Sequence, residues 1–273
     1  DFEDLKKKYT KDCVAVIPVH LGGNPCEMEK IMPWARKKKI TVIEDCAETA
    51  GGTYKGKKLG TWGDFGCFSF EEKKIMTTGD GGMICTNDKE KYKKIKKVSF
   101  HGWNKDPWSK HKNTIKKNLK ESWKYSIDTL GFKYNMNDLM ASIGLVQLKK
   151  LKFFNRKREK ILKKYIEGIK NCKNIKLGFE YELKNSSYWL FVIRCKKRDQ
   201  LIDYLKMKGI SSSVHFEPLP LQPLYKKYKS TIPNAKKAWL EIISLALFTD
   251  LNLSQINYII KIIKKFDKDY DKY

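Results

Sequence analysis

The chain has 273 residues, 41% of them hydrophobic, which is enough apolar content for one large or two modest domains. No apolar run approaches the length of a bilayer-spanning segment, and the first residues, DFEDLKKKYTKD, lack the layout of a secretory signal. We therefore expect a cytoplasmic protein without membrane contact. Seven cysteines are scattered without a CxxC pair, which argues against a disulfide framework and against a zinc ribbon.

The net charge of +26 raises the question of a polyanionic partner. The lysines are spread over the whole chain among many Ile, Asn and Tyr residues, which indicates a compositional bias and not one basic face. Dedicated nucleic-acid surfaces need clustered charge and interleaved aromatic residues, and neither is evident. We expect no specific nucleic-acid binding, whereas a small substrate that carries phosphate groups is easily accommodated.

Four short apolar runs in the first half predict strands, at 14–20, 41–46, 65–70 and 81–85. Their continuous β-branched and aromatic residues are typical of strands that are buried on both faces. Apolar residues at helical spacing predict helices at 27–39, where Pro33 is expected to disturb the helix or start a turn, and at 88–98. Strands that alternate with helices predict an α/β fold with a mainly parallel sheet.

Residues 103–128 are polar and rich in tryptophan and form a long excursion from this pattern. Two helices are predicted to follow, at 137–154 with Asn137 as a cap and at 156–169. The C-terminal part predicts a small α/β domain, with strands at 188–195 and 211–216 and helices at 198–209 and 253–266. We accordingly divide the chain into a large domain, residues 1–150, and a part with connecting helices and a small domain, residues 151–273.

The stretch SFEEKKIMTTGDGG, residues 69–82, places two adjacent lysines between a predicted strand and a glycine turn. A lysine just past the end of a buried strand can extend its amine into a cleft at the carboxyl edge of the sheet and hold a carbonyl cofactor covalently. Asp45 ends another predicted strand, and a carboxylate buried there needs a cationic partner. Pyridoxal 5'-phosphate offers both matches, because its aldehyde binds a lysine and its protonated ring nitrogen binds an aspartate.

Five blocks of sequence, in one order over nearly the whole chain, resemble the DegT/DnrJ/EryC1/StrS family of sugar aminotransferases. The blocks are PVHLGGNPCEMEKI, VIEDCAETAGGTYKGKKLGTWGDFGCFSF, KKIMTTGDGGMICTND, LGFKYNMNDLMASIGLVQL and VHFEPLPLQPLY. Family members are pyridoxal-phosphate enzymes of the aspartate-aminotransferase (type I) fold, which implies a mainly parallel large-domain sheet and a small C-terminal α/β domain. Relative to the family, the chain begins in the middle of the large domain, after the portion that carries a phosphate loop and an aromatic residue that stacks on the cofactor.

The resemblance implies roles for single residues. The family motif of Ser-Phe, three variable residues and the cofactor lysine selects Lys74 and leaves Lys73 as a neighbour. It implies that Asp45 pairs with the ring nitrogen and that Ser69 binds the cofactor phosphate. Glu48 stands where the family carries Gln, His or Glu beside the 3-oxygen of the cofactor, and a carboxylate there repels that oxygen unless it is protonated or paired.

Three further positions extend the expected site. Lys133 stands where family members offer Asn or Lys toward the phosphate of the neighbouring subunit, which implies a homodimer with shared active sites. Trp189 and His215 stand in family segments near the sugar and the mouth of the site, and for both residues a packing role is equally open. The histidines of the chain lack the spacing of metal ligands, and we expect no metal site.

The resemblance implies an aminotransferase that moves an amino group, from glutamate, to a keto carbon of a nucleotide-diphosphate hexose for polysaccharide biosynthesis. Lys74 would act as the base at the donor α-carbon. Three alternatives stay open. The first is a noncatalytic or split fragment that needs the missing N-terminal segment. The second is a sugar dehydratase with the same cofactor, against which Lys74 speaks because that subgroup replaces this lysine by His. The third is a basic nucleic-acid binder.

Overall fold

A four-stranded sheet forms the centre of the N-terminal part of the computed structural model, which describes residues 1–104, 125–183, 187–228 and 230–273. The strand order is β1 (Ala15–Val16), β2 (Thr41–Asp45), β5 (Phe65–Ser69) and β6 (Gly82–Cys85). β1 and β5 run parallel to β2, whereas β6 runs antiparallel to β5. The carboxyl ends of β2 and β5 therefore meet at the same edge of the sheet.

Helix α2 (Met28–Lys38) packs on this sheet through one apolar stripe. The stripe recurs every three or four residues and comprises Met28, Ile31, Met32 and Ala35. Pro33 lies on the exposed side of the helix and does not break it, contrary to the expectation of a disturbance or turn. Proline removes only one helical hydrogen bond, and the buried stripe on the other side holds the helix together.

The remaining elements of the N-terminal part are short. They are helix α1 (Phe2–Lys8), the 3-10 turn η1 (Leu21–Gly23), the hairpin of β3 (Thr53–Tyr54) and β4 (Lys57–Lys58), and helix α3 (Lys89–Val98). The hairpin turn at Lys55 and Gly56 has positive φ angles of 46° and 79°, as a tight two-residue turn requires. Asp88 caps α3 by accepting hydrogen bonds from the backbone N–H groups of Glu90 and Lys91.

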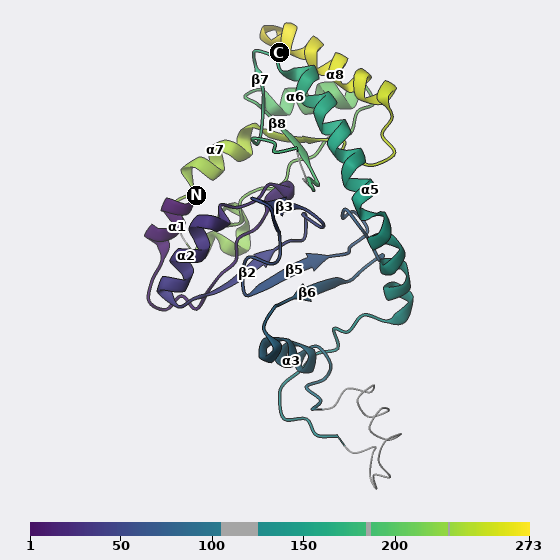
Figure 1. Cartoon of the computed structure of the whole chain (residues 1–273). Helices are drawn as coiled ribbons and strands as arrows, with labels where there is room; N and C mark the ends of the chain where they lie inside the picture. Colours follow the sequence, from purple (N-terminus) through teal and green to yellow (C-terminus); the bar gives the residue numbers. More distant parts are fainter. Residues whose placement is uncertain (105–124, 184–186, 229) are drawn as a thin grey trace.

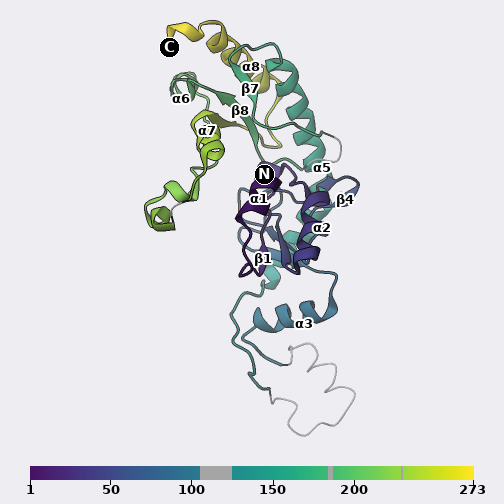
Figure 2. The ribbon, with the colours of Figure 1, turned by 90° about the vertical axis from the view of Figure 1, so that its left-hand side faces the viewer.

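An antiparallel sheet forms the C-terminal part, in the order β7 (Ile175–Leu177), β8 (Phe191–Cys195) and β9 (Ile242–Leu245). Its helices are α6 (Arg198–Met207), α7 (Pro233–Glu241) and α8 (Leu253–Lys268). Asn252 and Gln255 form a reciprocal capping box that starts α8. The turns η2 (Leu219–Leu221) and η3 (Pro223–Tyr228) extend away from this part before α7 (Figure 2), and η4 (Tyr270–Lys272) ends the chain.

One long helix, α5 (Asp138–Ile169), joins the two parts (Figure 1). Asn137 caps it by accepting a 2.9 Å hydrogen bond from the N–H of Met140, as the sequence predicts. Its middle touches the N-terminal part, where the Asn155 amide donates to the carbonyl of Ala50, 3.0 Å away. Its second half contributes Ile161, Leu162, Tyr165 and Ile169 to the core around β8. The predicted domain boundary at residue 150 falls within this helix and stays a prediction.

The structure differs from the predicted elements in four respects. A single helix replaces the two predicted at 137–154 and 156–169, because the apolar period continues through the intervening residues. The predicted strand at 211–216 is reduced to one bridge, between Ser213 and Ser244, and the strand at 14–20 is reduced to β1 and one bridge at Val19. The strands are not buried on both faces, since every residue of β6 is exposed.

Most of the predicted excursion at 103–128 lies outside the described residues. Among the described helices, none combines the length and the apolar character that crossing a bilayer requires.

Candidate active site

The ends of two parallel strands bring Asp45 and Ser69 to one edge of the sheet. Asp45 is the last residue of β2 and pairs with Cys67 of β5, two residues before Ser69. The Asp45 carboxylate accepts a hydrogen bond from the N–H of Ala47, 3.0 Å away, which is its only hydrogen bond or ion pair among the described residues. The Ser69 hydroxyl accepts one from the N–H of Glu71 at 3.3 Å and keeps its own proton available.

The turn after β5 separates the two adjacent lysines. The side chain of Lys74 is 17% exposed, whereas that of Lys73 is 74% exposed. The Lys74 amine lies 3.8 Å from a carboxylate oxygen of Glu48 and 4.3 Å from the centre of the Trp189 ring. A carboxylate and an aromatic face both attract an ammonium group, so these two side chains form two walls around the amine.

Glu48 is a buried carboxylate with two opposing influences on its pKa. Burial raises the pKa, while the N–H of Gly22, which lies 2.5 Å from Oε2, and the ammonium of Lys74 lower it. The nearby Asp45 raises it further, and the net effect is a pKa above the ordinary value. The neutral form of Glu48 is thus favoured relative to a glutamate in water.

Trp189 and His215 reach this cluster from the C-terminal part. The indole N–H of Trp189 donates to the carbonyl of Lys73 at 2.7 Å, which fixes the ring beside the lysine turn. His215 packs edge to face against Trp189, with ring centres 5.5 Å apart, and its Nδ1 lies 2.9 Å from the hydroxyl of Ser244. Burial, and to a lesser degree the charge of Lys74, lower the pKa of His215. The neutral imidazole is therefore favoured.

No contact among the described residues joins Lys133 to this cluster. It is exposed, donates a 2.7 Å hydrogen bond to Asn135 and lies 5.7 Å from the centre of the Phe100 ring. Sequence reasoning in turn missed Gly22, whose N–H binds Glu48. A Gly-Gly pair directly after an apolar strand was the available signal, because it indicates backbone with positive φ or close approach.

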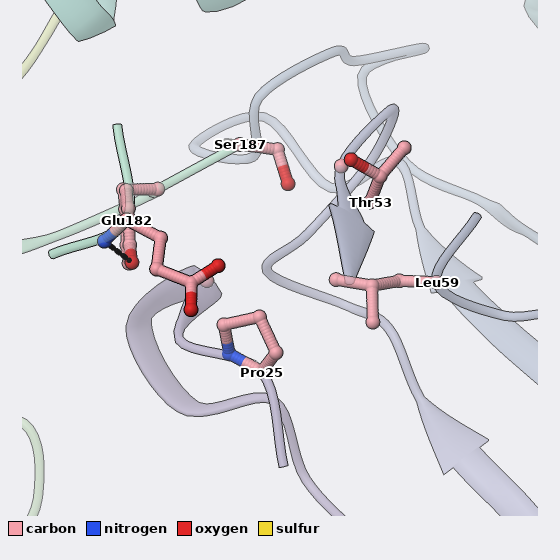
Figure 3. A pocket seen from close by; sticks show the side chains of 8 residues that line it. Pro25, Thr53, Leu59, Glu182 and Ser187 are labelled. Carbon is pink, nitrogen blue, oxygen red and sulfur yellow. Dashed lines mark hydrogen bonds between the residues drawn. The ribbon is translucent and has the colours of Figure 1, made fainter. Parts of the chain in front are cut away.

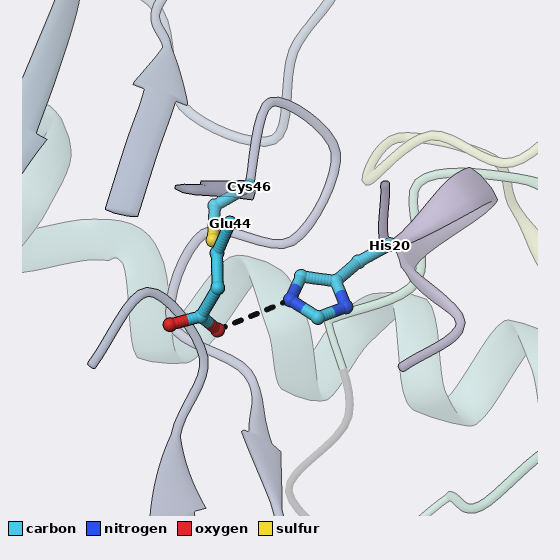
Figure 4. A group of neighbouring side chains, drawn as sticks. All are labelled: His20, Glu44 and Cys46. Atoms are coloured by element: carbon cyan, nitrogen blue, oxygen red, sulfur yellow. Dashed lines mark hydrogen bonds and ion pairs between the residues drawn. The ribbon is translucent and has the colours of Figure 1, made fainter. Parts of the chain in front are cut away.

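His20, Glu44 and Cys46 bring potential metal ligands within 4.8 Å of one another (Figure 4). The polar atoms of His20 and Glu44 are already engaged. Nδ1 of His20 accepts the N–H of Cys26, so the proton sits on Nε2 and is donated to Glu44 at 3.2 Å.

The carboxylate of Glu44 also accepts three backbone N–H groups, from Gly60, Trp62 and Gly63. Burial raises its pKa, but the hydrogen bonds from His20, Gly63 and Gly60 outweigh burial and leave the pKa lowered. This network ties the segment before η1 to β2, and we read it as structural.

A small pocket lies between the segment of Gly23 and Pro25, the hairpin of β3 and β4, and the segment before β8 (Figure 3). Its volume of about 10 Å³ accommodates roughly one water molecule. The lining residues are Gly23, Pro25, Gly52, Thr53, Leu59, Glu182, Ser187 and Tyr188. None of the predicted site residues lines it, so the chemistry is not placed there.

Comparison with known proteins identifies the family of the chain. The family model of the DegT/DnrJ/EryC1/StrS aminotransferases matches residues 1–264. An uncharacterised protein of Methanocaldococcus jannaschii, MJ1066, is 37% identical and covers 96% of this chain, which spans 69% of that protein. The GDP-perosamine synthase of Escherichia coli O157:H7 is 34% identical and covers 97% of this chain, which spans 69% of that protein.

Solved structures give the same result. The Spr1654 protein of Streptococcus pneumoniae in its PMP form is 31% identical and superposes with a TM-score of 0.86, over 98% of this chain and 73% of its own. The aminotransferase TlmJ of Streptoalloteichus hindustanus is 26% identical, with a TM-score of 0.87 over 100% of this chain and 70% of its own. The type I aminotransferase fold is thereby established. The chain belongs to the DegT/DnrJ/EryC1/StrS aminotransferase family.

Proposed function

We propose that the chain is a pyridoxal-phosphate-dependent aminotransferase that transfers an amino group, from glutamate, to a keto carbon of a nucleotide-diphosphate hexose. The observation that carries the proposal is the partly enclosed amine of Lys74 beside Glu48 and Trp189, in the turn that follows β5. The chain has 57 Lys and Arg residues. Lys74 differs from the exposed lysines because its amine is largely shielded from solvent, and desolvation makes a lysine amine a better nucleophile toward an aldehyde.

The side chains at the sheet edge fit the cofactor. Lys74 would hold its aldehyde, and Ser69 would donate its free hydroxyl proton to the phosphate. Asp45 has one carboxylate oxygen bonded to Ala47 and the other open, which suits a protonated ring nitrogen. Glu48, whose pKa is raised by burial, repels a ring oxygen less than an ordinary glutamate would. The PLP and PMP forms of Spr1654 support the same cofactor.

When bound, pyridoxal phosphate supplies a carbonyl for the amino donor and a ring that withdraws electrons from the α-carbon of the donor. The amine of Lys74, when not bonded to the cofactor, would take the proton from the α-carbon of the donor in the first half-reaction. In the second half-reaction, which runs the same steps in reverse, it would give a proton to the keto carbon of the sugar that becomes aminated. Asp45 holds a proton on the ring nitrogen through a charge-assisted hydrogen bond. Trp189 and Glu48 keep the amine close to its point of action, and the buried surroundings limit access of water.

The sugar substrate is proposed from two lines of support. One relative is a GDP-perosamine synthase, and another, SpsC of Bacillus subtilis, 32% identical, is a protein of spore coat polysaccharide biosynthesis. The ring of Trp189 and the imidazole of His215 lie together beside the lysine, where they offer an apolar face and a polar edge. This combination suits a hexose.

We further propose a homodimer. Leu139, Ile143 and Val146 follow one another at helical spacing on α5, and their exposed fractions are 79%, 48% and 50%. Leu130 and Tyr134, just before the helix, are also exposed. An apolar stripe of this kind needs a cover, and a second copy of the chain provides one. Lys133, in the same region, is then free to reach the cofactor phosphate of the neighbouring subunit.

The first test is an absorbance spectrum of the chain with pyridoxal phosphate, before and after the addition of glutamate, followed by borohydride trapping and peptide mapping. We expect a band from covalently bound cofactor that glutamate bleaches, with the label on Lys74. An absent band, or a label spread over many surface lysines, contradicts the proposed cofactor site. Formation of an aminated nucleotide hexose from the keto sugar then tests the substrate.

A further inference from the structure

The backbone of Gly22 connects the two walls of the Lys74 amine. Its N–H donates to Glu48 Oε2 at 2.5 Å, while its carbonyl accepts from the N–H groups of Trp189 and Leu190 at 2.9 and 3.2 Å. Glu48 follows β2 in the large domain, whereas Trp189 precedes β8 in the small domain. The backbone of Gly22 is thus hydrogen-bonded both to Glu48 of the large domain and to Trp189 of the small domain, the two residues that flank the Lys74 amine.

Gly23 lets the two segments approach to a distance that other residues do not permit. A Cβ atom at Gly23 would lie 2.6 Å from Cα of Tyr188 and 2.7 Å from the carbonyl oxygen of Ser187. At Gly22 the Cβ atom would lie 3.0 Å from the Phe179 ring, which is a milder contact with a side chain. Both glycines also have positive φ angles, 66° at Gly22 and 87° at Gly23.

The segment that carries these glycines is anchored from behind. The preceding His20 is completely buried and bonded to Glu44, which in turn holds three backbone groups of the Gly60 to Gly63 turn. Since buried hydrogen-bonded networks are rigid, the position of the Gly22 backbone is set by the large-domain sheet. The small-domain segment adjusts to it through the two bonds to the Gly22 carbonyl.

We propose that Gly22 and Gly23 are positioning residues that set Glu48 and Trp189 around the amine of Lys74. Any effect of these glycines on catalysis rests on the proposed function, in which Lys74 binds the cofactor. Among the described residues, neither glycine is hydrogen-bonded to the Lys74 amine. They act through the two walls, so a change at either glycine opens the enclosure of Lys74 while the lysine itself stays in place.

The test measures how fast an amine-reactive acylating reagent labels Lys74 in the full chain without added cofactor. Lys73 is the internal reference, because it is the next residue and its side chain is exposed. In Gly23→Ala the new methyl group pushes the Tyr188 backbone away, and we expect the ratio of Lys74 to Lys73 labelling to rise severalfold. The matched control is Gly56→Ala, since Gly56 has a similar φ of 79° but nothing within 4 Å of a Cβ atom.

Gly56→Ala imposes the same kind of backbone strain without a clash, so its labelling ratio should equal that of the unmodified chain. If Gly23→Ala fails to fold, as judged by its thermal transition, Gly22→Ala takes its place with a smaller expected rise. The proposal is overturned if the folded glycine variant, Gly23→Ala or its substitute Gly22→Ala, shows the same ratio of Lys74 to Lys73 labelling as Gly56→Ala. Borohydride mapping decides the cofactor role of Lys74 separately, so a failure there leaves the labelling result interpretable.

Discussion

Glu48 and Lys74 face each other at 3.8 Å, yet the environment does not favour a fully charged pair. Burial, together with the charge of Asp45, raises the pKa of Glu48 by more than the Gly22 N–H and the Lys74 charge lower it. A neutral carboxyl at this position removes the repulsion that an ionised one would exert on a ring oxygen of the cofactor. In the proposed site, Glu48 would therefore lie close to the lysine amine without the full repulsion of an ionised carboxylate.

The pH dependence of stability tests this account of Glu48. A carboxyl whose folded pKa is raised above its ordinary value of 4.5 binds more protons in the folded state. Its stabilising contribution is complete below pH 4.5 and is lost as the pH rises through the folded pKa. Glu48→Gln keeps an oxygen for the Gly22 N–H and lacks the titration. We expect the wild type to lose free energy of unfolding relative to Glu48→Gln as the pH rises from 4.5 upward.

The measurement is urea unfolding of both proteins at a series of pH values, and the useful quantity is the difference between them. Other titrating groups are common to both proteins and cancel in that difference. The opposite slope, a gain of the wild type relative to the Gln variant with rising pH, would mean that Glu48 is held ionised by Lys74.

Alanine substitutions of Lys74 and Lys73 test which of the two adjacent lysines has the catalytic role. Lys74→Ala should lower the rate of amino transfer by about 10²-fold to 10⁴-fold, the usual contribution of a positioned acid–base group, and should abolish covalent cofactor binding. Lys73→Ala keeps the carbonyl that binds Trp189 and loses only an exposed side chain, so its activity should stay close to that of the wild type. Turnover assays and absorbance spectra of both variants measure the two effects. Equal losses of activity in Lys74→Ala and Lys73→Ala would refute the assignment of Lys74 as the cofactor lysine.

Asp45→Asn tests the open carboxylate at the end of β2. The amide oxygen can still accept the N–H of Ala47, so the free energy of unfolding should change little. The charge-assisted hydrogen bond to the cofactor ring is lost, and at about 1.5–3 kcal/mol for such a bond we expect activity to fall about 10- to 100-fold. Chemical denaturation and steady-state kinetics measure the two effects. A large loss of stability with unchanged activity per folded molecule would make Asp45 a structural residue.

Strand order explains why part of this site could be predicted from the sequence. Asp45 and Ser69 end parallel neighbouring strands, and a lysine in the following turn necessarily starts from the same edge. The cap at Asn137 and the apolar stripe of α2 follow local rules in the same way. These features depend on residues close in the chain or on regular pairing.

The walls of the Lys74 amine depend on contacts that no local rule specifies. Trp189 reaches the lysine turn from another domain, and Gly22 reaches Glu48 through a loop whose shape is set by the buried bond between His20 and Glu44. The prediction that β6 is buried on both faces was wrong for a related reason. An apolar sequence indicates a strand, but it does not indicate whether other segments of the same chain cover that strand. Tertiary contacts of this kind become visible only in the assembled fold.

The exposed stripe on α5 gives a test of the proposed homodimer. Leu139→Glu introduces a charge into a side chain that is 79% exposed in the single chain, so the monomer should fold normally while the dimer dissociates. Met207→Glu, on α6 of the small domain, alters a side chain that is 73% exposed and should leave the dimer intact. Sedimentation velocity at several protein concentrations distinguishes the two outcomes. If both variants sediment like the wild type, this stripe is not the interface, and Lys133 does not serve a neighbouring site by this route.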